Sequence, residues 1–349
     1  MKIASLQFDK GEVACLKMDQ GYIPIPLINQ RFNKDWPVDF LAIIAEQKLE
    51  EIKDWFQITR DKNQDDITEL SIPQETALYR PLYRRPRKIW GIGLNYQAHA
   101  EDLSARLPDT EPASFMKPDT TIIGHGDIIK IPEFSQRTTG EAELGLIFGK
   151  KCRNVSQRDW KTVIAGFTTI IDMTAEDILM RNPRNLTQAK SFDTFFSFGP
   201  IFYTLDEVDD LFQLEVKTVL NGKIQAENIV DNMTFPLDYL VSYHSQIMTM
   251  LAGDILSTGT PGAAEIQDGD LIEAQIGELY PLSNQGIFVA GSPFTHVVWF
   301  GGCVLQIVGA PWPSKNKNPQ PLFISRITSF GPVSVPSDVK SVVFLNPGM

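Results

Sequence analysis

The chain has 349 residues, of which 43% are hydrophobic and 21% are charged, and its formal net charge is -11. These values are typical of a globular protein and exclude a fibrous or extensively disordered chain. The net negative charge argues against a nucleic-acid partner, because protein surfaces that bind nucleic acids need clustered Lys and Arg. The length predicts one large domain with a smaller appendage.

The cysteines are few and widely spaced: Cys15, Cys152 and Cys303. This pattern argues against a disulfide framework and against a thiolate zinc site. The start of the chain lacks the apolar core of a signal peptide, and the most apolar stretch, 297–310, is interrupted by two glycines and too short to cross a bilayer. We therefore expect a cytoplasmic protein without a membrane segment.

The first part of the chain predicts a small α/β domain. Alternating apolar residues over 1–25 predict three short strands, and helical spacing follows over 39–48 and 49–58. The stretch 73–87 is rich in Pro and Arg and is a candidate linker. We place the N-terminal domain at 1–80.

Short strands and helices alternate from 88 to about 285. Strands are predicted at 88–92, 143–148, 166–172 and 254–257, a hairpin at 214–229, and helices at 95–103 and 235–250. Thr174 and Asp177 have a spacing close to a capping box, which predicts that a helix starts at Thr174. Many short strands with few long helices indicate an α+β class, a β-rich mixed fold, for a catalytic domain at 81–287.

The remaining segment, 288–349, differs in composition. It contains a single acidic residue, Asp338, and is rich in Pro, Ser, Val and Phe. We treat it as a C-terminal extension and assign it no function.

A pair of glutamates is the clearest candidate for a functional site. In a strand, Glu141 and Glu143 point to the same face, and the apolar residues after them take the strand into the interior. A cation between two buried carboxylates removes both their repulsion and their desolvation cost. Asp172 ends another apolar strand and would complete an oxygen site for Mg²⁺ or Mn²⁺. The alternatives are an exposed acidic pair and, for Asp172, a helix cap.

A histidine with acidic neighbours is the second candidate. The glycines at 91 and 93 begin a dinucleotide fingerprint that fails because Tyr96 occupies the third glycine position. His99 and Asp102 are three apart on one face of a short predicted helix, so the acid could orient the imidazole as a general base for water. Glu101 is the alternative partner, and a surface histidine is the alternative interpretation.

Three further positions are candidates for substrate binding. Lys190, held near a metal, would bind an anionic substrate or a developing enolate. Thr260 lies in a tight turn after a strand, and Lys117 precedes a proline. Taken alone, each is better explained as a solvated side chain or an ordinary turn.

Together these elements resemble the fumarylacetoacetate hydrolase family over residues 88–285. The matching pieces, in chain order, are GLNYQAHAED, FMKPDTTIIGHGD, GEAELGLIFGK, AGFTTIIDMTAED, AKSFDTF, the VLNGKI hairpin, AGDILSTGTPGA and PLSNQG. One match would be weak, but eight in order are specific.

The resemblance implies a β-rich mixed roll, usually a homodimer, that binds Mg²⁺, Mn²⁺ or Ca²⁺. By position, it assigns the metal ligands to Glu141, Glu143 and Asp172, the catalytic residues to His99, Asp102, Glu101 and Lys190, and substrate binding to Lys117, Thr260 and Tyr96. The implied activity is hydrolysis of a carbon–carbon bond in an acylpyruvate or related 1,3-dioxo or 2-oxo acid. The alternatives are an oxaloacetate-type decarboxylase, a hydroxymuconate-type isomerase and a non-catalytic member.

The sequence also departs from the family pattern. Glu176 stands where the family usually has Arg, Leu179 where a polar residue is usual, and Ile171 where Asn is usual. The dyad acid is the shorter Asp102. These changes leave the metal ligands in place and put the usual substrate in question.

Overall fold

The computed structural model describes residues 1–19, 21–62, 64–102, 108, 110–288, 295–300 and 303–308. The chain divides into two compact units, Met1–Phe288 and Val289–Met349. The first unit contains all the candidate site residues.

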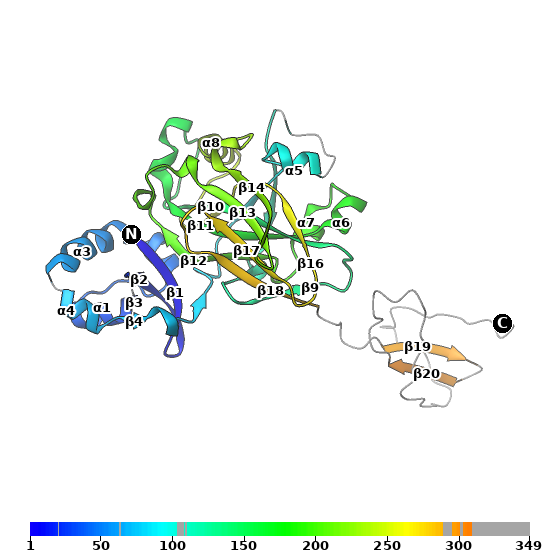
Figure 1. The fold of residues 1–349 in the computed structure, drawn as a ribbon, viewed down its shortest axis with the longest axis horizontal. Helices are drawn as coiled ribbons and strands as arrows, with labels where there is room; N and C mark the ends of the chain where they lie inside the picture. Colours follow the sequence, from blue (N-terminus) through cyan, green and yellow to red (C-terminus); the bar gives the residue numbers. More distant parts are fainter. Residues whose placement is uncertain are drawn as a thin grey trace. The chain divides into compact units, whose positions relative to one another are not determined.

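Two sheets form the frame of the first unit (Figure 1). The strands of the larger sheet are β1 (Lys2–Phe8), β2 (Gly11–Lys17), β3 (Gly21–Pro24), β4 (Ile72–Pro73), β5 (Tyr79–Arg80), β6 (Ile89–Gly93), β7 (Ala113–Lys117), β8 (Ile122–Ile123), β10 (Thr138–Phe148), β11 (Ile164–Ala175), β12 (Phe196–Tyr203), β15 (Ile255–Ser257) and β16 (Ala263–Ile266). Its main order is β4-β3-β2-β1-β12-β11-β10-β15-β6-β7. The smaller sheet has the order β14-β13-β17-β18-β9 and consists of β9 (Ile128–Ile131), β13 (Glu215–Leu220), β14 (Lys223–Ile229), β17 (Leu271–Ile276) and β18 (Leu282–Phe288).

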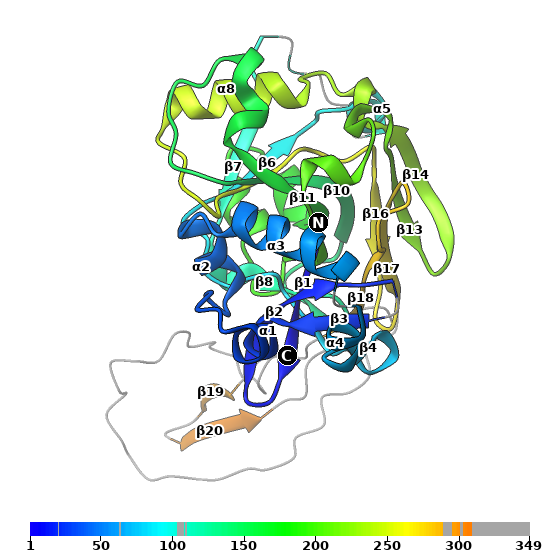
Figure 2. The ribbon, with the colours of Figure 1, turned by 90° about the vertical axis from the view of Figure 1, so that its left-hand side faces the viewer.

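The helices of the described residues are short, and the longest, α3 (Leu49–Lys62), has 14 residues. They are α1 (Ile25–Phe32), α2 (Phe40–Ala45), α3 (Leu49–Lys62), α4 (Gln64–Glu69), α5 (Gln97–Asp102), α6 (Glu176–Arg181), α7 (Leu186–Lys190) and α8 (Leu237–Ile247). Figure 2 shows α1 to α4, in blue, gathered around the first strands, whereas α8 lies at the far end of the unit. None of the helices in the described part of the chain is long and apolar enough to cross a membrane.

The predicted β-rich mixed fold is confirmed, as are the hairpin and the helices expected near 40, 50, 97 and 237. The N-terminal strands continue the same sheet as β10 and β11, because β1 pairs with β12 in antiparallel fashion. Residues 1–80 lie within the first compact unit. The domain boundaries at 80 and 287 stay predictions.

The larger sheet separates two hydrophobic cores, and alternate residues of its strands contribute to each. Leu144 and Leu146 of β10 pack in the core that includes the smaller sheet. Ile147 of β10 and Ile170 of β11 pack in the other core, with the N-terminal helices. By this alternation, Glu141 and Glu143 lie on the same face as Ile147.

One sequence-based boundary was wrong. Thr174 does not start a helix, because β11 continues to Ala175 and α6 begins at Glu176. Pairing with β10 decides this: Thr174 lies opposite Thr139 in an antiparallel ladder whose register is continuous from Thr138 to Ile147. Asp172 is likewise within the strand and is not a helix cap.

In the second unit, the described residues form one antiparallel hairpin, β19 (Thr295–Phe300) with β20 (Cys303–Val308). The side chains of the apolar stretch 297–310 lie outside the described part of the structure.

Candidate metal centre

Two adjacent strands bring three carboxylates together. Glu141 of β10 lies directly opposite Asp172 of β11, and Glu143 is two residues further along β10 on the same face. Glu141 is 6% exposed, Glu143 1% and Asp172 0%. One oxygen from each carboxylate lies within 4.8 Å of the others. The three residues predicted as metal ligands therefore form one buried cluster.

Two buried lysines contact the cluster. Lys190, at the end of α7, donates to Glu141 Oε2 at 2.9 Å and to Asp172 Oδ2 at 2.6 Å. Lys117, at the end of β7, donates to Asp172 Oδ1 at 2.5 Å and to the Met173 carbonyl at 3.1 Å. Two ammonium groups beside three carboxylates leave one negative charge uncompensated.

Hydroxyl and amide groups hold the two glutamates. Thr174 Oγ1 donates to Glu141 Oε1 at 2.6 Å. Ser257 Oγ donates to Glu143 Oε2, which also accepts the Gly259 N–H at 3.0 Å. The sequence predicted that Ser257 and Gly259 lie where a strand ends in a tight turn with exposed backbone N–H groups, but not that they hold Glu143.

The electrostatics identify Glu143 as the carboxylate that lacks a cation. Burial, followed by the charges of Asp172 and Glu141, raises the pKa of Glu143 to about 8. Burial also disfavours the charge of Asp172, but Lys117 and Lys190 outweigh it and lower the pKa of that carboxyl. Burial lowers the pKa of Lys117 to about 8. Although burial opposes the charge of Lys190, Asp172 and Glu141 raise its pKa above the usual value.

This donor set fits a hard divalent cation. Three carboxylates supply oxygen ligands only, and such sets suit Mg²⁺, Mn²⁺ or Ca²⁺ better than zinc. Each carboxylate oxygen has two lone pairs, so an oxygen that accepts from a lysine can also face a cation. A divalent cation would also compensate the remaining negative charge at Glu143.

The family model for the fumarylacetoacetate (FAA) hydrolase C-terminal region matches residues 88–286, more than half of the chain. The chain belongs to the fumarylacetoacetate hydrolase family. The match covers the strands, turn and lysines that build the carboxylate cluster.

Relatives within this family have different activities. The mitochondrial oxaloacetate tautomerase of Rattus norvegicus is 32% identical over 222 residues, which span 61% of this chain and 71% of that protein. The 2-hydroxyhepta-2,4-diene-1,7-dioate isomerase of Mycobacterium marinum is 29% identical, with a TM-score of 0.57 over 64% of this chain and 82% of that one. The maleylpyruvate hydrolase of Sphingobium sp. SYK-6, in complex with manganese(II) and pyruvate, shares the fold at 24% identity, with a TM-score of 0.67 over 82% of this chain and 99% of that one.

The residues just before α5 meet the turn before β16, which holds Glu143. The Asn95 amide donates to the Thr258 carbonyl at 2.8 Å, and Gly259 packs against Asn95. Tyr96 is fully buried, and burial together with the charge of Glu143 raises its pKa above the usual value. His99 is 6% exposed. His99 lies on α5, the helix predicted for it, but the side chains of its predicted acidic partners, Asp102 and Glu101, lie outside the described residues, so the dyad stays a prediction.

The remaining predicted substrate residue, Thr260, is used within its own turn. It is 2% exposed, and its hydroxyl donates to the Gly262 carbonyl at 2.9 Å. The substrate roles of Thr260, Lys117 and Tyr96, and the catalytic roles of His99 and Lys190, stay predictions.

Glu176, which stands where the family usually has Arg, pairs with a nearby arginine that the sequence analysis missed. Arg137, directly before β10, lies 3.0 Å from Glu176 Oε2 through Nε and 2.8 Å from Glu265 through Nη1. The Glu176 N–H donates to the Arg137 carbonyl, so this pair extends the β10–β11 ladder by one rung. Strand parity places Arg137, four residues before Glu141, on the same face, but only the register of β10 against β11 identifies Glu176 as its partner.

Proposed function

We propose that the chain is a metal-dependent hydrolase that cleaves a carbon–carbon bond in an acylpyruvate or a related 1,3-dioxo or 2-oxo acid. The observation that carries this proposal is the buried cluster of Glu141, Glu143 and Asp172 with Lys117 and Lys190 against it. Such a site can accept a small anion whose charge grows during reaction, because fixed cations and a divalent metal converge in a volume from which water is largely excluded.

Each group has a separate role in the proposed reaction. A divalent cation held by the three carboxylates would supply Lewis-acid polarisation of the 2-oxo group. Lys190 and Lys117 supply positive charge beside the carboxylate cluster, where the substrate's own negative charge develops. His99, oriented by Asp102 or Glu101, accepts a proton from the water that adds to the distal carbonyl. The carbon–carbon bond then breaks, and the electron pair leaves as the enolate of the 2-oxo acid, which takes up a proton.

A second candidate function is keto–enol tautomerisation of a 2-oxo acid on the same residues. The specific observation in its favour is the 32% identity to an oxaloacetate tautomerase, together with the 29% identity to a dienedioate isomerase. Tautomerisation needs the enolate-stabilising cluster and a group that carries a proton between carbon and oxygen, but no attacking water. Lys117, whose pKa burial lowers to about 8, can carry that proton, so His99 is the residue that distinguishes the two functions.

The test is turnover of acetylpyruvate and of oxaloacetate, side by side, in Mg²⁺ and in EDTA. Metal-dependent cleavage of acetylpyruvate to pyruvate and acetate supports the hydrolase. Enol–keto exchange of oxaloacetate without acetylpyruvate cleavage supports the tautomerase. Inactivity on both, with no Mg²⁺ bound, would favour a non-catalytic member.

Two isosteric variants assign the activity to the cluster. Glu141→Gln and Asp172→Asn should each reduce turnover by at least about 100-fold, because each removes a charged ligand. Glu265→Gln is the matched control, since it removes a carboxylate that pairs with Arg137 outside the cluster. Wild-type turnover in Glu141→Gln would contradict the metal assignment.

A further inference from the structure

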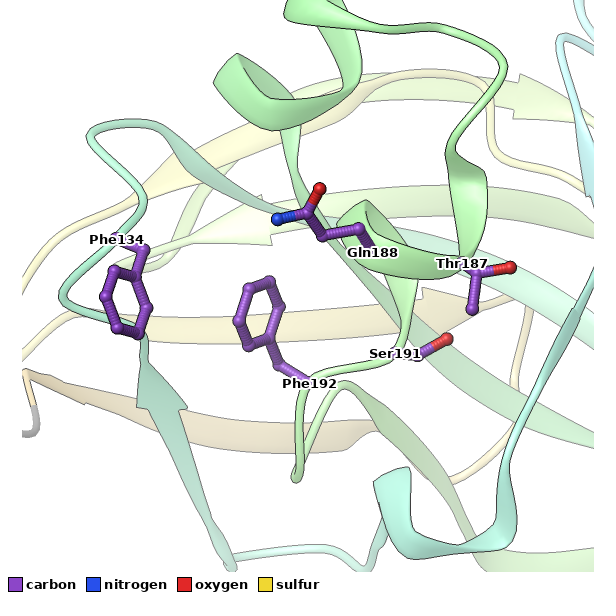
Figure 3. Close-up of a pocket in the computed structure, with 5 residues that line it drawn as sticks. All are labelled: Phe134, Thr187, Gln188, Ser191 and Phe192. Carbon is purple, nitrogen blue, oxygen red and sulfur yellow. The ribbon is translucent and has the colours of Figure 1, made fainter. Parts of the chain in front are cut away.

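Lys190 reaches the carboxylate cluster from α7, a helix that has local support of its own. The Asn185 side chain caps this helix by accepting the Gln188 N–H at 3.3 Å. Figure 3 shows the segment, with the Gln188 amide beside the Phe192 ring and the Thr187 hydroxyl on the other side of the helix. The cap holds the start of the helix, and the helix carries the lysine to the cluster.

His99 lies on α5, which is not one of the elements that carry the three carboxylates. Figures 1 and 2 both show α5 and α8 at the same end of the first unit. Helix α5 has 6 residues, and a helix of this length is unstable without contacts to other parts of the chain. Asn95, two residues before the helix begins, makes such contacts.

The Asn95 side chain joins three segments of the chain. Its Nδ2 donates to the Thr258 carbonyl at 2.8 Å and to the Phe235 carbonyl at 3.1 Å. Its Oδ1 accepts the Phe235 N–H at 2.8 Å, and its backbone carbonyl accepts the Thr234 N–H at 2.8 Å. Asn95 is 0% exposed. Among side chains of this length, only an amide offers two donors and an acceptor in one plane.

The backbone on both sides of this contact has left-handed φ values. Leu94 has φ +55°, which is uncommon for a leucine. Gly259 has φ +98°, and a Cβ there would lie 2.7 Å from Asn95 Cβ. Such conformations persist where the surrounding contacts require them. The hydrogen bonds of Asn95 therefore hold the start of α5 and the turn before β16 in one defined arrangement.

We propose that Asn95 is a positioning residue that sets the distance between His99 and Glu143. The proposal rests on the proposed function, which assigns the histidine to the attacking water and the glutamate to the metal. Thr258, which Asn95 holds, directly precedes Gly259, and the Gly259 N–H donates to Glu143 Oε2 at 3.0 Å. On the other side, Asn95 lies four residues before His99. One side chain thus determines both where the turn meets the metal ligand and where α5 carries the general base.

The test compares two variants that each remove a buried amide. Asn95→Ala breaks the proposed link. Asn284→Ala is the matched control, because Asn284 is also 0% exposed and its Nδ2 donates to two carbonyls, those of Gly124 at 2.7 Å and Asp127 at 2.8 Å. None of the residues at this control site belongs to the carboxylate cluster. Both variants should lose resistance to urea to a similar extent, because each leaves two carbonyls without their donor.

Only Asn95→Ala should alter the site. We expect calorimetry to show Mg²⁺ binding about tenfold weaker, because the Gly259 N–H moves away from Glu143. At saturating Mg²⁺, acetylpyruvate turnover should still be about 100-fold lower with KM within about threefold, because His99 is displaced from the reacting water. Asn284→Ala should retain wild-type Mg²⁺ affinity and turnover. Equal losses in the two variants would show that Asn95 supports only the fold, and would overturn the proposal.

Hydrogen exchange in the wild type tests the same link without a substitution. Mg²⁺ should slow exchange of the Gly259 N–H and of the Phe235 N–H, which donates to Asn95, by at least about threefold each. Exchange of the Asp127 N–H, at the control site, should not change. Slower exchange at Gly259 alone would overturn the proposal and leave the metal site standing. Failure of the wild type to bind Mg²⁺ would remove the metal of the proposed function, and the positioning role with it.

Discussion

The Lys190 ammonium lies 2.6 Å from a carboxylate oxygen of Asp172, and both side chains are buried. Lys117 contacts the other oxygen of the same carboxylate. Asp172 is thus held between two lysines on the face where a divalent cation would bind. The lysines and the cation therefore compete for the same negative charge, and several consequences can be measured.

Removing Lys190 should tighten metal binding and weaken catalysis. Lys190→Met keeps the length of the side chain but removes a positive charge beside two proposed ligands. We expect Mg²⁺ affinity to rise roughly tenfold, a conservative value for a charge at this distance, while turnover falls by about 100-fold. Calorimetry and steady-state kinetics measure the two effects.

Lys88→Met is the control for this experiment. Lys88 also contacts a buried carboxylate, Asp254, at 2.6 Å, but it makes no contact with the cluster. It should leave Mg²⁺ affinity unchanged. Weaker Mg²⁺ binding in Lys190→Met would refute the competition described above.

The turn at Gly259 should be intolerant of a side chain. Gly259 has φ +98°, and a Cβ there would lie 2.7 Å from Asn95 Cβ. Gly259→Ala should cost about 1–3 kcal/mol of stability and weaken Mg²⁺ binding, because the Gly259 N–H donates to Glu143. Gly222→Ala has a similar positive φ with no atom within 4 Å of the added Cβ, so it should lower stability without affecting the metal.

Replacing His99 should separate hydrolysis from tautomerisation. His99→Ala is expected to reduce acylpyruvate cleavage by about 100-fold or more, because general-base catalysis is lost. Enol–keto exchange of oxaloacetate should persist, because Lys117 carries the proton in that reaction. His125→Ala serves as the comparison, since His125 packs against Tyr79 and Tyr280 instead. Undiminished acylpyruvate cleavage by His99→Ala would remove the histidine from the mechanism.

His244 should make the fold less stable in mild acid. Burial lowers its pKa from the usual 6.5, and its Nδ1 donates to the Leu240 carbonyl at 2.8 Å. As the pH falls below about 6.5, the unfolded chain binds a proton that the folded chain refuses, so the free energy of unfolding decreases. Above that pH the effect is absent, because the imidazole is neutral in both states.

Urea unfolding of wild type and His244→Gln between pH 7.5 and 5.5 measures this contribution. The wild type should lose about 1 kcal/mol more than the variant over that range. The difference isolates His244, because the other titrating groups, including His125, are common to both proteins. Parallel pH profiles would show that His244 is not a destabilising buried base.

The three carboxylates of the cluster could be predicted because the signals for them are local and the family resemblance assigned them together. The Glu-x-Glu spacing and the apolar run after it predict a strand with both carboxylates on one face. The apolar run before Asp172 predicted the second strand, which continues to Ala175. The pairing of the strands, such as β1 with β12, could not be predicted, because residues about 200 apart in the chain share no local sequence pattern.

Where a local sequence pattern and a long-range contact favoured different structures, the long-range contact determined the structure. The spacing of Thr174 and Asp177 favours a helix start, but pairing with Thr139 keeps Thr174 in β11 and directs its hydroxyl to Glu141. Similarly, the sequence by itself shows Glu176 only as a negative charge at a position where the family usually has a positive one. Its pairing with Arg137 could be inferred only with the register of β10 against β11 known.

The connection from β11 to β12 combines two roles in one short segment. Glu176 to Phe195 carries α6, α7 and Lys190, whereas the three carboxylates belong to the β10–β11 ladder. The segment begins and ends at strands that are neighbours in the sheet. Exchange of this one connection during evolution, or by loop grafting in the laboratory, would change the cation beside the cluster while the three carboxylates keep their places.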